Sequence, residues 1–104
     1  RYEESLRSYE RLKEIMPDDI PALRGRMNVL AAMKDLAGLD AAAQEMLGLA
    51  PAEVSAHLFI IDTLLGLGAE KEAEPYLDKA QAAFPKDLEV LDRRRSLHAK
   101  HKRF

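Results

Sequence analysis

Residues 54–87 read VSAHLFIIDTLLGLGAEKEAEPYLDKAQAAFPKD, and the fold of the whole chain can be worked out from them. Residues 54–67 place apolar side chains at three-to-four spacing, which predicts one amphipathic helix. Gly66 and Gly68 stand where that helix should stop, because glycine reaches the left-handed conformation that closes a helix end without steric cost. Residues 71–84 form a second helical pattern. These residues therefore predict a hairpin of two helices joined by a tight turn.

The proline punctuation of this hairpin recurs along the chain. Pro17, Pro51 and Pro85 are equally spaced, at an interval typical of a repeat array, which we call the repeat period. Pro85 ends the second helical pattern, because proline disfavours helical dihedral angles in the residue before it. Residues 20–53 carry another version of the hairpin. In this version Lys34 and its neighbours form the turn that glycine forms in residues 54–87.

The hairpin resembles the tetratricopeptide repeat, a helix-turn-helix unit of this length with glycine at its turn, alanines in its second helix and a proline near its end. The residues that match this pattern are Gly68, Ala73, Ala80 and Pro85. His57 departs from it, since the family favours tryptophan or another large residue there. The resemblance implies an all-α fold of six helices, an α-solenoid of antiparallel helix pairs that belongs to a longer right-handed superhelix.

On this interpretation the chain is a single domain of 104 residues. Residues 1–19 are expected to form the second helix of a partial repeat, and residues 20–53 and 54–87 two full repeats. Residues 88–104 are expected to form the first helix of a further repeat or a capping helix. A cap fits their many charged residues, because the last helix of a solenoid needs a polar outer face.

The resemblance also implies a binding groove lined by the first helix of each pair. The groove residues that it indicates are Arg24, Asn28, Leu58, Phe59, Asp62, Leu65, Glu89, Asp92, Arg93 and Ser96. Such a mixture of apolar and charged groups suits an extended segment or a helix of a partner protein. The alternative is that the apolar members pack against the neighbouring helix. Some family members clamp a peptide carboxylate here, but Phe59 and Glu89 replace an asparagine and a lysine of that clamp, and Glu89 would repel a carboxylate.

Composition and charge bear on other classes of function. The net charge is −2 and the chain has no cysteine, so thiolate zinc sites and disulfides are excluded. Residues 88–104 carry six Lys or Arg against two acidic residues, but no aromatic platform accompanies them, and a solvated helix is expected rather than a nucleic-acid site. His98 and His101 share a helix face without a nearby carboxylate or cysteine, so we expect no metal site and no cofactor.

These observations together predict a non-catalytic protein–protein interaction module that scaffolds a complex, with a protein or peptide as its partner. No nucleophile–base pair, phosphate-binding glycine loop or zinc-protease motif is found. The alternative is a structural spacer or self-association segment of a bacterial envelope protein, for example a periplasmic scaffold in exopolysaccharide export. No apolar run approaches the length that spans a membrane. The sequence leaves the location open between the bacterial periplasm and the cytoplasm.

Overall fold

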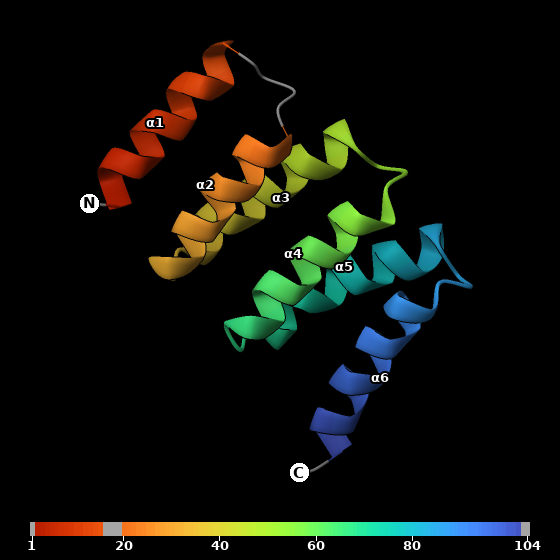
Figure 1. The fold of residues 1–104 in the computed structure, drawn as a ribbon. Helices are drawn as coiled ribbons and strands as arrows, with labels where there is room; N and C mark the ends of the chain where they lie inside the picture. Colours follow the sequence, from red (N-terminus) through yellow and green to blue (C-terminus); the bar gives the residue numbers. More distant parts are fainter. Residues whose placement is uncertain (1, 16–19, 103–104) are drawn as a thin grey trace. The chain divides into compact units, whose positions relative to one another are not determined.

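The computed structural model describes residues 2–15 and 20–102, of which residues 98–102 are described by their backbone alone. Pro17 and the side chains of His98 and His101 lie outside this description. Over the described residues the chain forms six helices and no strand, which confirms the all-α prediction. The helices are α1 (Tyr2–Ile15), α2 (Ile20–Ala32), α3 (Leu36–Leu49), α4 (Val54–Gly66), α5 (Glu70–Ala83) and α6 (Leu88–Lys102), labelled in Figure 1.

The helix boundaries recur at the interval of the prolines. α1, α3 and α5 begin at residues 2, 36 and 70 and end at residues 15, 49 and 83, so both ends recur at the repeat period. α2, α4 and α6 begin at residues 20, 54 and 88, again one repeat period apart. We call α2, α4 and α6 the first helices, and α1, α3 and α5 the second helices. Residues separated by one repeat period therefore occupy equivalent places on helices of one kind.

The turns between α2 and α3 and between α4 and α5 have the same backbone geometry. Gly68 has φ of +75° and Lys34, one repeat period earlier, has φ of +58°. In one turn the N–H of Asp35 donates to the carbonyl of Leu30, and in the other the N–H of Ala69 donates to that of Leu64. A second bond in each turn runs from Lys34 to Ala31 and from Gly68 to Leu65. This pair of hydrogen bonds around one left-handed residue is the Schellman motif, which ends a helix. It reverses the chain, so that the next helix lies beside the one before it.

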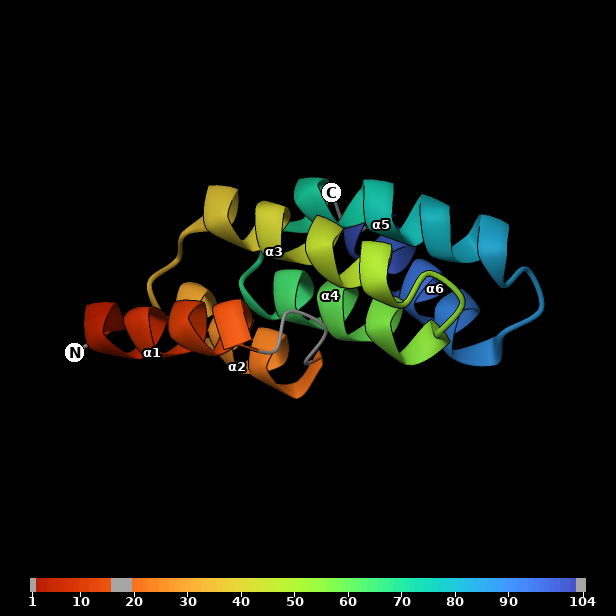
Figure 2. The same cartoon turned by 90° about the horizontal axis from the view of Figure 1, so that it is seen from above.

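The chain divides into two compact units, residues 1–51 and residues 52–104. In the first unit α2 packs against both α1 and α3, and Figures 1 and 2 show α3 antiparallel beside α2. The buried core of this unit comes from α2 and α3, through Leu23, Met27, Leu30, Leu39, Ala42, Ala43 and Met46. α1 contributes no fully buried side chain. It instead lays the ring of Tyr9 over Gly25 of α2, where a Cβ atom would come within 2.5 Å of the tyrosine oxygen.

In the second unit α5 packs against α4 and α6, and α4 also contacts α6. The buried residues of these helices include Ala56, His57, Ile60, Ile61, Leu64, Ala73, Tyr76, Leu77, Ala80, Val90 and Leu97. The small side chains of Ala73 and Ala80 are both fully buried on α5, as expected of positions where two helices approach closely. His57 is buried and meets the ring of Phe84 edge to face, with 5.2 Å between the ring centres.

Packing in both units thus runs mostly between helices that are neighbours in the sequence. None of the helices in the described part of the chain is both long enough and apolar enough to cross a membrane.

Candidate functional site

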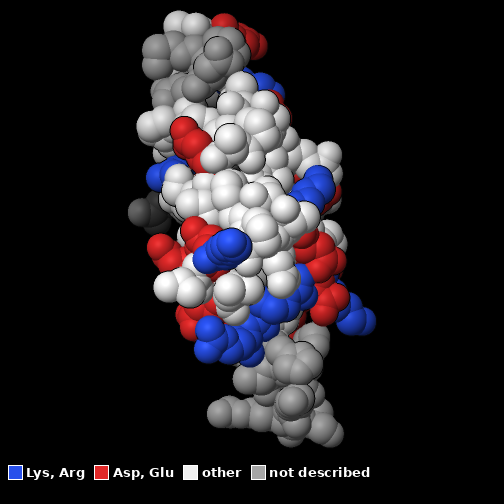
Figure 3. Space-filling model, turned by 90° about the vertical axis from the view of Figure 1, so that its right-hand side faces the viewer, with Lys and Arg blue, Asp and Glu red and all other residues white. Residues whose placement is uncertain are grey.

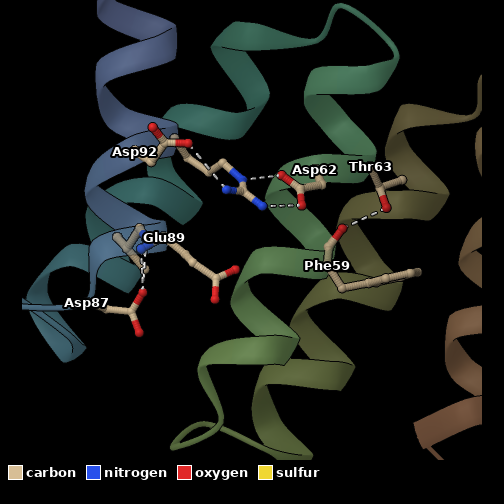
Figure 4. A network of polar contacts seen from close by, with 8 residues as sticks. Phe59, Asp62, Thr63, Asp87, Glu89 and Asp92 are labelled. Atoms are coloured by element: carbon tan, nitrogen blue, oxygen red, sulfur yellow. Dashed lines mark hydrogen bonds and ion pairs between the residues drawn. The ribbon is translucent and has the colours of Figure 1, made fainter.

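The second unit brings two of the predicted groove residues into direct contact between its first helices, α4 and α6. Arg93 of α6 donates two hydrogen bonds to Asp62 of α4, from Nε to Oδ1 at 2.7 Å and from the second guanidinium nitrogen to Oδ2 at 3.1 Å. Figure 4 shows this two-pronged contact between the helices. Paired bonds of this kind fix orientation as well as distance, because a planar guanidinium matches a planar carboxylate. The contact therefore holds the outer faces of α4 and α6 in register.

Two further carboxylates lie around Arg93 on α6. Asp92 lies 3.7 Å from the guanidinium, and the carboxylate of Glu89 points toward α4 in Figure 4. The hydrogen bond to Asp62 raises the pKa of Arg93 above its ordinary value, against a smaller opposing effect of burial, and the charges of Asp62, Glu89 and Asp92 add to the rise. With three carboxylates and one guanidinium, this cluster is acidic. We call Asp62, Glu89, Asp92 and Arg93 the α4–α6 surface.

The first turn of α6 is set by Asp87. Its carboxylate oxygen Oδ1 accepts hydrogen bonds from the backbone N–H groups of Glu89, at 2.9 Å, and of Val90, at 3.1 Å. Asp87 is therefore the N-cap of the helix, where an acceptor satisfies donors that have no partner within the helix. Because the cap fixes where α6 begins, it also fixes which residues of α6 face α4.

The apolar groove candidates differ in how far they reach the surface. Leu58 is buried, with 8% of its surface exposed, and so belongs to the packed interior of its unit. Phe59 and Leu65 are half-buried. Figure 4 shows the Phe59 ring extending from the side of α4 that faces away from α6, and the hydroxyl of Thr63 donates to the Phe59 carbonyl at 2.7 Å. Phe59 therefore lies on the other side of α4 from the α4–α6 surface, and Leu58 lies in the core.

The remaining groove candidates lie elsewhere. Ser96 is exposed on α6, one turn beyond Asp92. Arg24 and Asn28 lie one turn apart on α2 in the first unit, where Arg24 is half-buried and Asn28 is exposed. Equivalence by the repeat period places Asn28, Asp62 and Ser96 at the same position of the three first helices.

An ion cluster in the first unit was not foreseen from the sequence. Glu45 of α3 pairs with Lys13 of α1 and with Arg26 of α2, the latter at 2.9 Å. Burial raises the pKa of Glu45, but the hydrogen bonds and positive charges of Lys13 and Arg26 outweigh it, and the pKa lies below its ordinary value. Such a cluster joins residues that are far apart in the sequence, so no local pattern signals it.

Acidic and basic side chains of the described residues pair with one another at several places. Figure 3 shows acidic and basic side chains adjoining one another on the face in view. The basic residues Arg93 and Arg94 of α6 are both engaged, Arg94 with Asp78 and with Gln81 of α5. Among the described residues, no group of three or more His, Asp or Glu side chains is arranged to hold a metal ion.

Comparison of the chain with protein-family models and with curated proteins gives no match in either. The resemblance to the tetratricopeptide repeat therefore rests on the residue pattern described above.

Proposed function

We propose that this chain is a non-catalytic protein–protein interaction module of the tetratricopeptide type, which holds a partner against the outer faces of α4 and α6. The observation that carries the proposal is the α4–α6 surface, where two helices present exposed carboxylates around a two-pronged ion pair. The return of helix boundaries and turn geometry at the repeat period supports a repeat array as its scaffold.

The α4–α6 surface favours a basic partner segment. Asp62, Glu89 and Asp92 are exposed and Arg93 neutralises only one of them, so a Lys or Arg side chain of a partner gains favourable contacts here. The half-buried ring of Phe59 extends from the opposite side of α4, where an apolar residue of a partner segment that crosses α4 can pack. A surface already held by the Asp62–Arg93 contact loses little freedom on binding, and this lowers the entropic cost of association.

The experiment is a selection of binding peptides from a phage-displayed random library, followed by fluorescence anisotropy with the selected synthetic peptides. We expect the selected peptides to be rich in Lys and Arg. Glu89→Lys should weaken their binding about tenfold, because a favourable ion pair becomes a repulsion worth roughly 1.4 kcal/mol in total. Phe59→Ala by itself should also weaken the binding of these peptides. Circular dichroism checks that both variants keep their helix content.

The matched control is Glu74→Lys, the same charge change at an exposed residue of α5, a second helix. It should leave binding unchanged. The proposed location is wrong if Glu74→Lys and Glu89→Lys weaken binding equally. It is also wrong if neither Glu89→Lys nor Phe59→Ala changes the affinity of the selected peptides.

A further inference from the structure

The face that α6 packs into its unit carries an arginine near its centre. Val90 and Leu97 of this face are 0% and 2% exposed, and Arg94 lies between them, about one helix turn from each. Residues three or four apart share one face of a helix, so Arg94 belongs to the same packed strip. At the equivalent position α4 has Ile60, which is fully buried. α6 therefore carries a charged group where another first helix carries an apolar one.

Arg94 uses this position to bind α5. Its Nε donates to the side-chain oxygen of Gln81 at 3.2 Å, and a terminal guanidinium nitrogen pairs with the carboxylate of Asp78. The arginine side chain is 30% exposed, so the contact is partly shielded from water. Its equivalent on α2, Arg26, likewise pairs with a carboxylate of a second helix, Glu45 of α3. An arginine at this register thus links a first helix to a second helix in both units.

The preceding residue, Arg93, reaches a different helix. It pairs with Asp62 of α4, while Arg94 pairs with Asp78 of α5. Consecutive residues of an α-helix point roughly 100° apart, so the two arginines leave α6 on different sides. Since α6 packs against both α4 and α5, each arginine strengthens one of its two contacts. We call Arg93 and Arg94 the arginine clamp.

The arginine clamp limits how far α6 can turn about its own axis. Side-chain ends lie about 6 Å from that axis, so a turn of about 20° would move them by about 2 Å. A movement of that size would break the two-pronged contact of Arg93 with Asp62, whose bonds are 2.7 Å and 3.1 Å long. It would also displace the carboxylates of Glu89 and Asp92 on the same helix. The hold of Arg94 on α5 therefore bears on residues of the α4–α6 surface.

We propose that Arg94 is a positioning residue of the α4–α6 surface. By holding α6 on α5, it keeps Glu89, Asp92 and the Asp62–Arg93 pair in the places where a basic partner meets them. The effect on partner binding rests on the proposed function. The effect on the Asp62–Arg93 pair exists in the free chain, so it can be measured without a partner.

Charge and position predict opposite effects of removing Arg94. A basic partner is repelled by positive charge, so the loss of charge alone would tighten binding slightly. The loss of positioning should outweigh this, and Arg94→Gln should weaken the binding of the selected Lys- and Arg-rich peptides about three- to fivefold, the range open to a partly exposed ion pair. Arg95→Gln is the matched control, because Arg95 is an exposed residue of the same helix and loses the same charge. Its binding should stay the same or tighten.

A second measurement needs no partner. In the isotope-labelled protein the Nε–H resonance of Arg93 reports on its bond to Asp62. Asp78→Asn removes the charged anchor of Arg94 and should shift this resonance, although Asp78 lies on α5. Glu74→Gln, the same loss of one negative charge at an exposed residue of α5, should leave the resonance in place. Combining Asp78→Asn with Arg94→Gln should add little to the change that either makes alone, because both remove one contact.

The outcomes separate the two proposals. Circular dichroism checks that each variant remains folded, and Asp78, at 71% exposed, can be changed without disturbing the core. The role of Arg94 is overturned if Arg94→Gln binds the peptides as tightly as Arg95→Gln does. It is equally overturned if Asp78→Asn moves the Arg93 resonance no further than Glu74→Gln does. If no basic peptide binds the parent protein, the proposed function fails, and the Arg93 resonance decides the role of Arg94.

Discussion

The crossing of α1 and α2 gives the sharpest test of the packing. Ala normally stabilises a helix relative to Gly by about 1 kcal/mol. At Gly25, however, a Cβ atom would lie 2.5 Å from the oxygen and 2.6 Å from the ring carbon Cζ of Tyr9, so the Tyr9 ring must leave its place to admit it. Overpacking of this kind costs about 1–3 kcal/mol. Gly25→Ala should therefore lower the free energy of unfolding by up to about 2 kcal/mol, although helix propensity alone predicts the opposite sign.

The same substitution should change sign once the tyrosine is removed. A Tyr9→Ala background removes the three atoms nearest to that Cβ, so Gly25→Ala should raise the free energy of unfolding there by about 1 kcal/mol. Urea unfolding of the four proteins, followed by circular dichroism, gives the coupling energy between the two sites. Gly48→Ala is the control, because a Cβ at Gly48 of α3 meets no atom within 4 Å and should stabilise in both backgrounds. Stabilisation by Gly25→Ala in the presence of Tyr9 would rule out the close crossing.

Three further outcomes follow from the fold. Lys34→Gly should raise the free energy of unfolding by about 1 kcal/mol, because a residue with a side chain is strained at φ of +58°, and Gly68→Ala should lower it by a similar amount; urea unfolding of both checks this. Ala80→Leu should lower the thermal stability by about 1–3 kcal/mol through overpacking, while exposed Ala82→Leu should be nearly neutral, and equal effects would contradict the register of α5. Folding lowers the pKa of Glu45 below its ordinary value of 4.5. The ion pairs of Glu45 should therefore stabilise the fold at pH values above 4.5, and this stabilisation should be lost as the pH falls through the lowered pKa of the folded chain. The stability difference between the parent and Glu45→Gln, less than about 1 kcal/mol at neutral pH, should then shrink in urea unfolding at about pH 3, and a constant difference would exclude the ion pairs as its cause.

Equivalent positions on the first helices serve different contacts. Gly25, Phe59 and Arg93 are spaced by the repeat period and so occupy one place on α2, α4 and α6. Gly25 lies under the ring of Tyr9, Phe59 presents its own half-buried ring, and Arg93 forms the ion pair with Asp62. A shared backbone therefore carries unlike side chains at one register, which is how a repeat fold can offer a surface with its own specificity.

Much of the fold could be predicted because its signals are local. The three-to-four spacing of apolar residues, the glycines at residues 66 and 68, and Pro85 each act within one turn of chain. They placed α4 and α5 within one residue of their observed ends. The cap at Asp87 was predictable for the same reason. The candidate site was less predictable. The sequence placed Leu58 and Asp62 on one helix but did not show that Leu58 is buried and Asp62 exposed.

The number, length and turns of the helices follow from the order of amino acids without further information, since backbone hydrogen bonds and dihedral preferences reach no further than a few residues. Only the packed fold shows that Arg93 meets Asp62, 31 residues away, and that Arg26 meets Glu45, 19 residues away. Those meetings depend on how each helix is rotated about its axis when its apolar side is buried. That rotation is set by packing between whole helix faces and by no single residue.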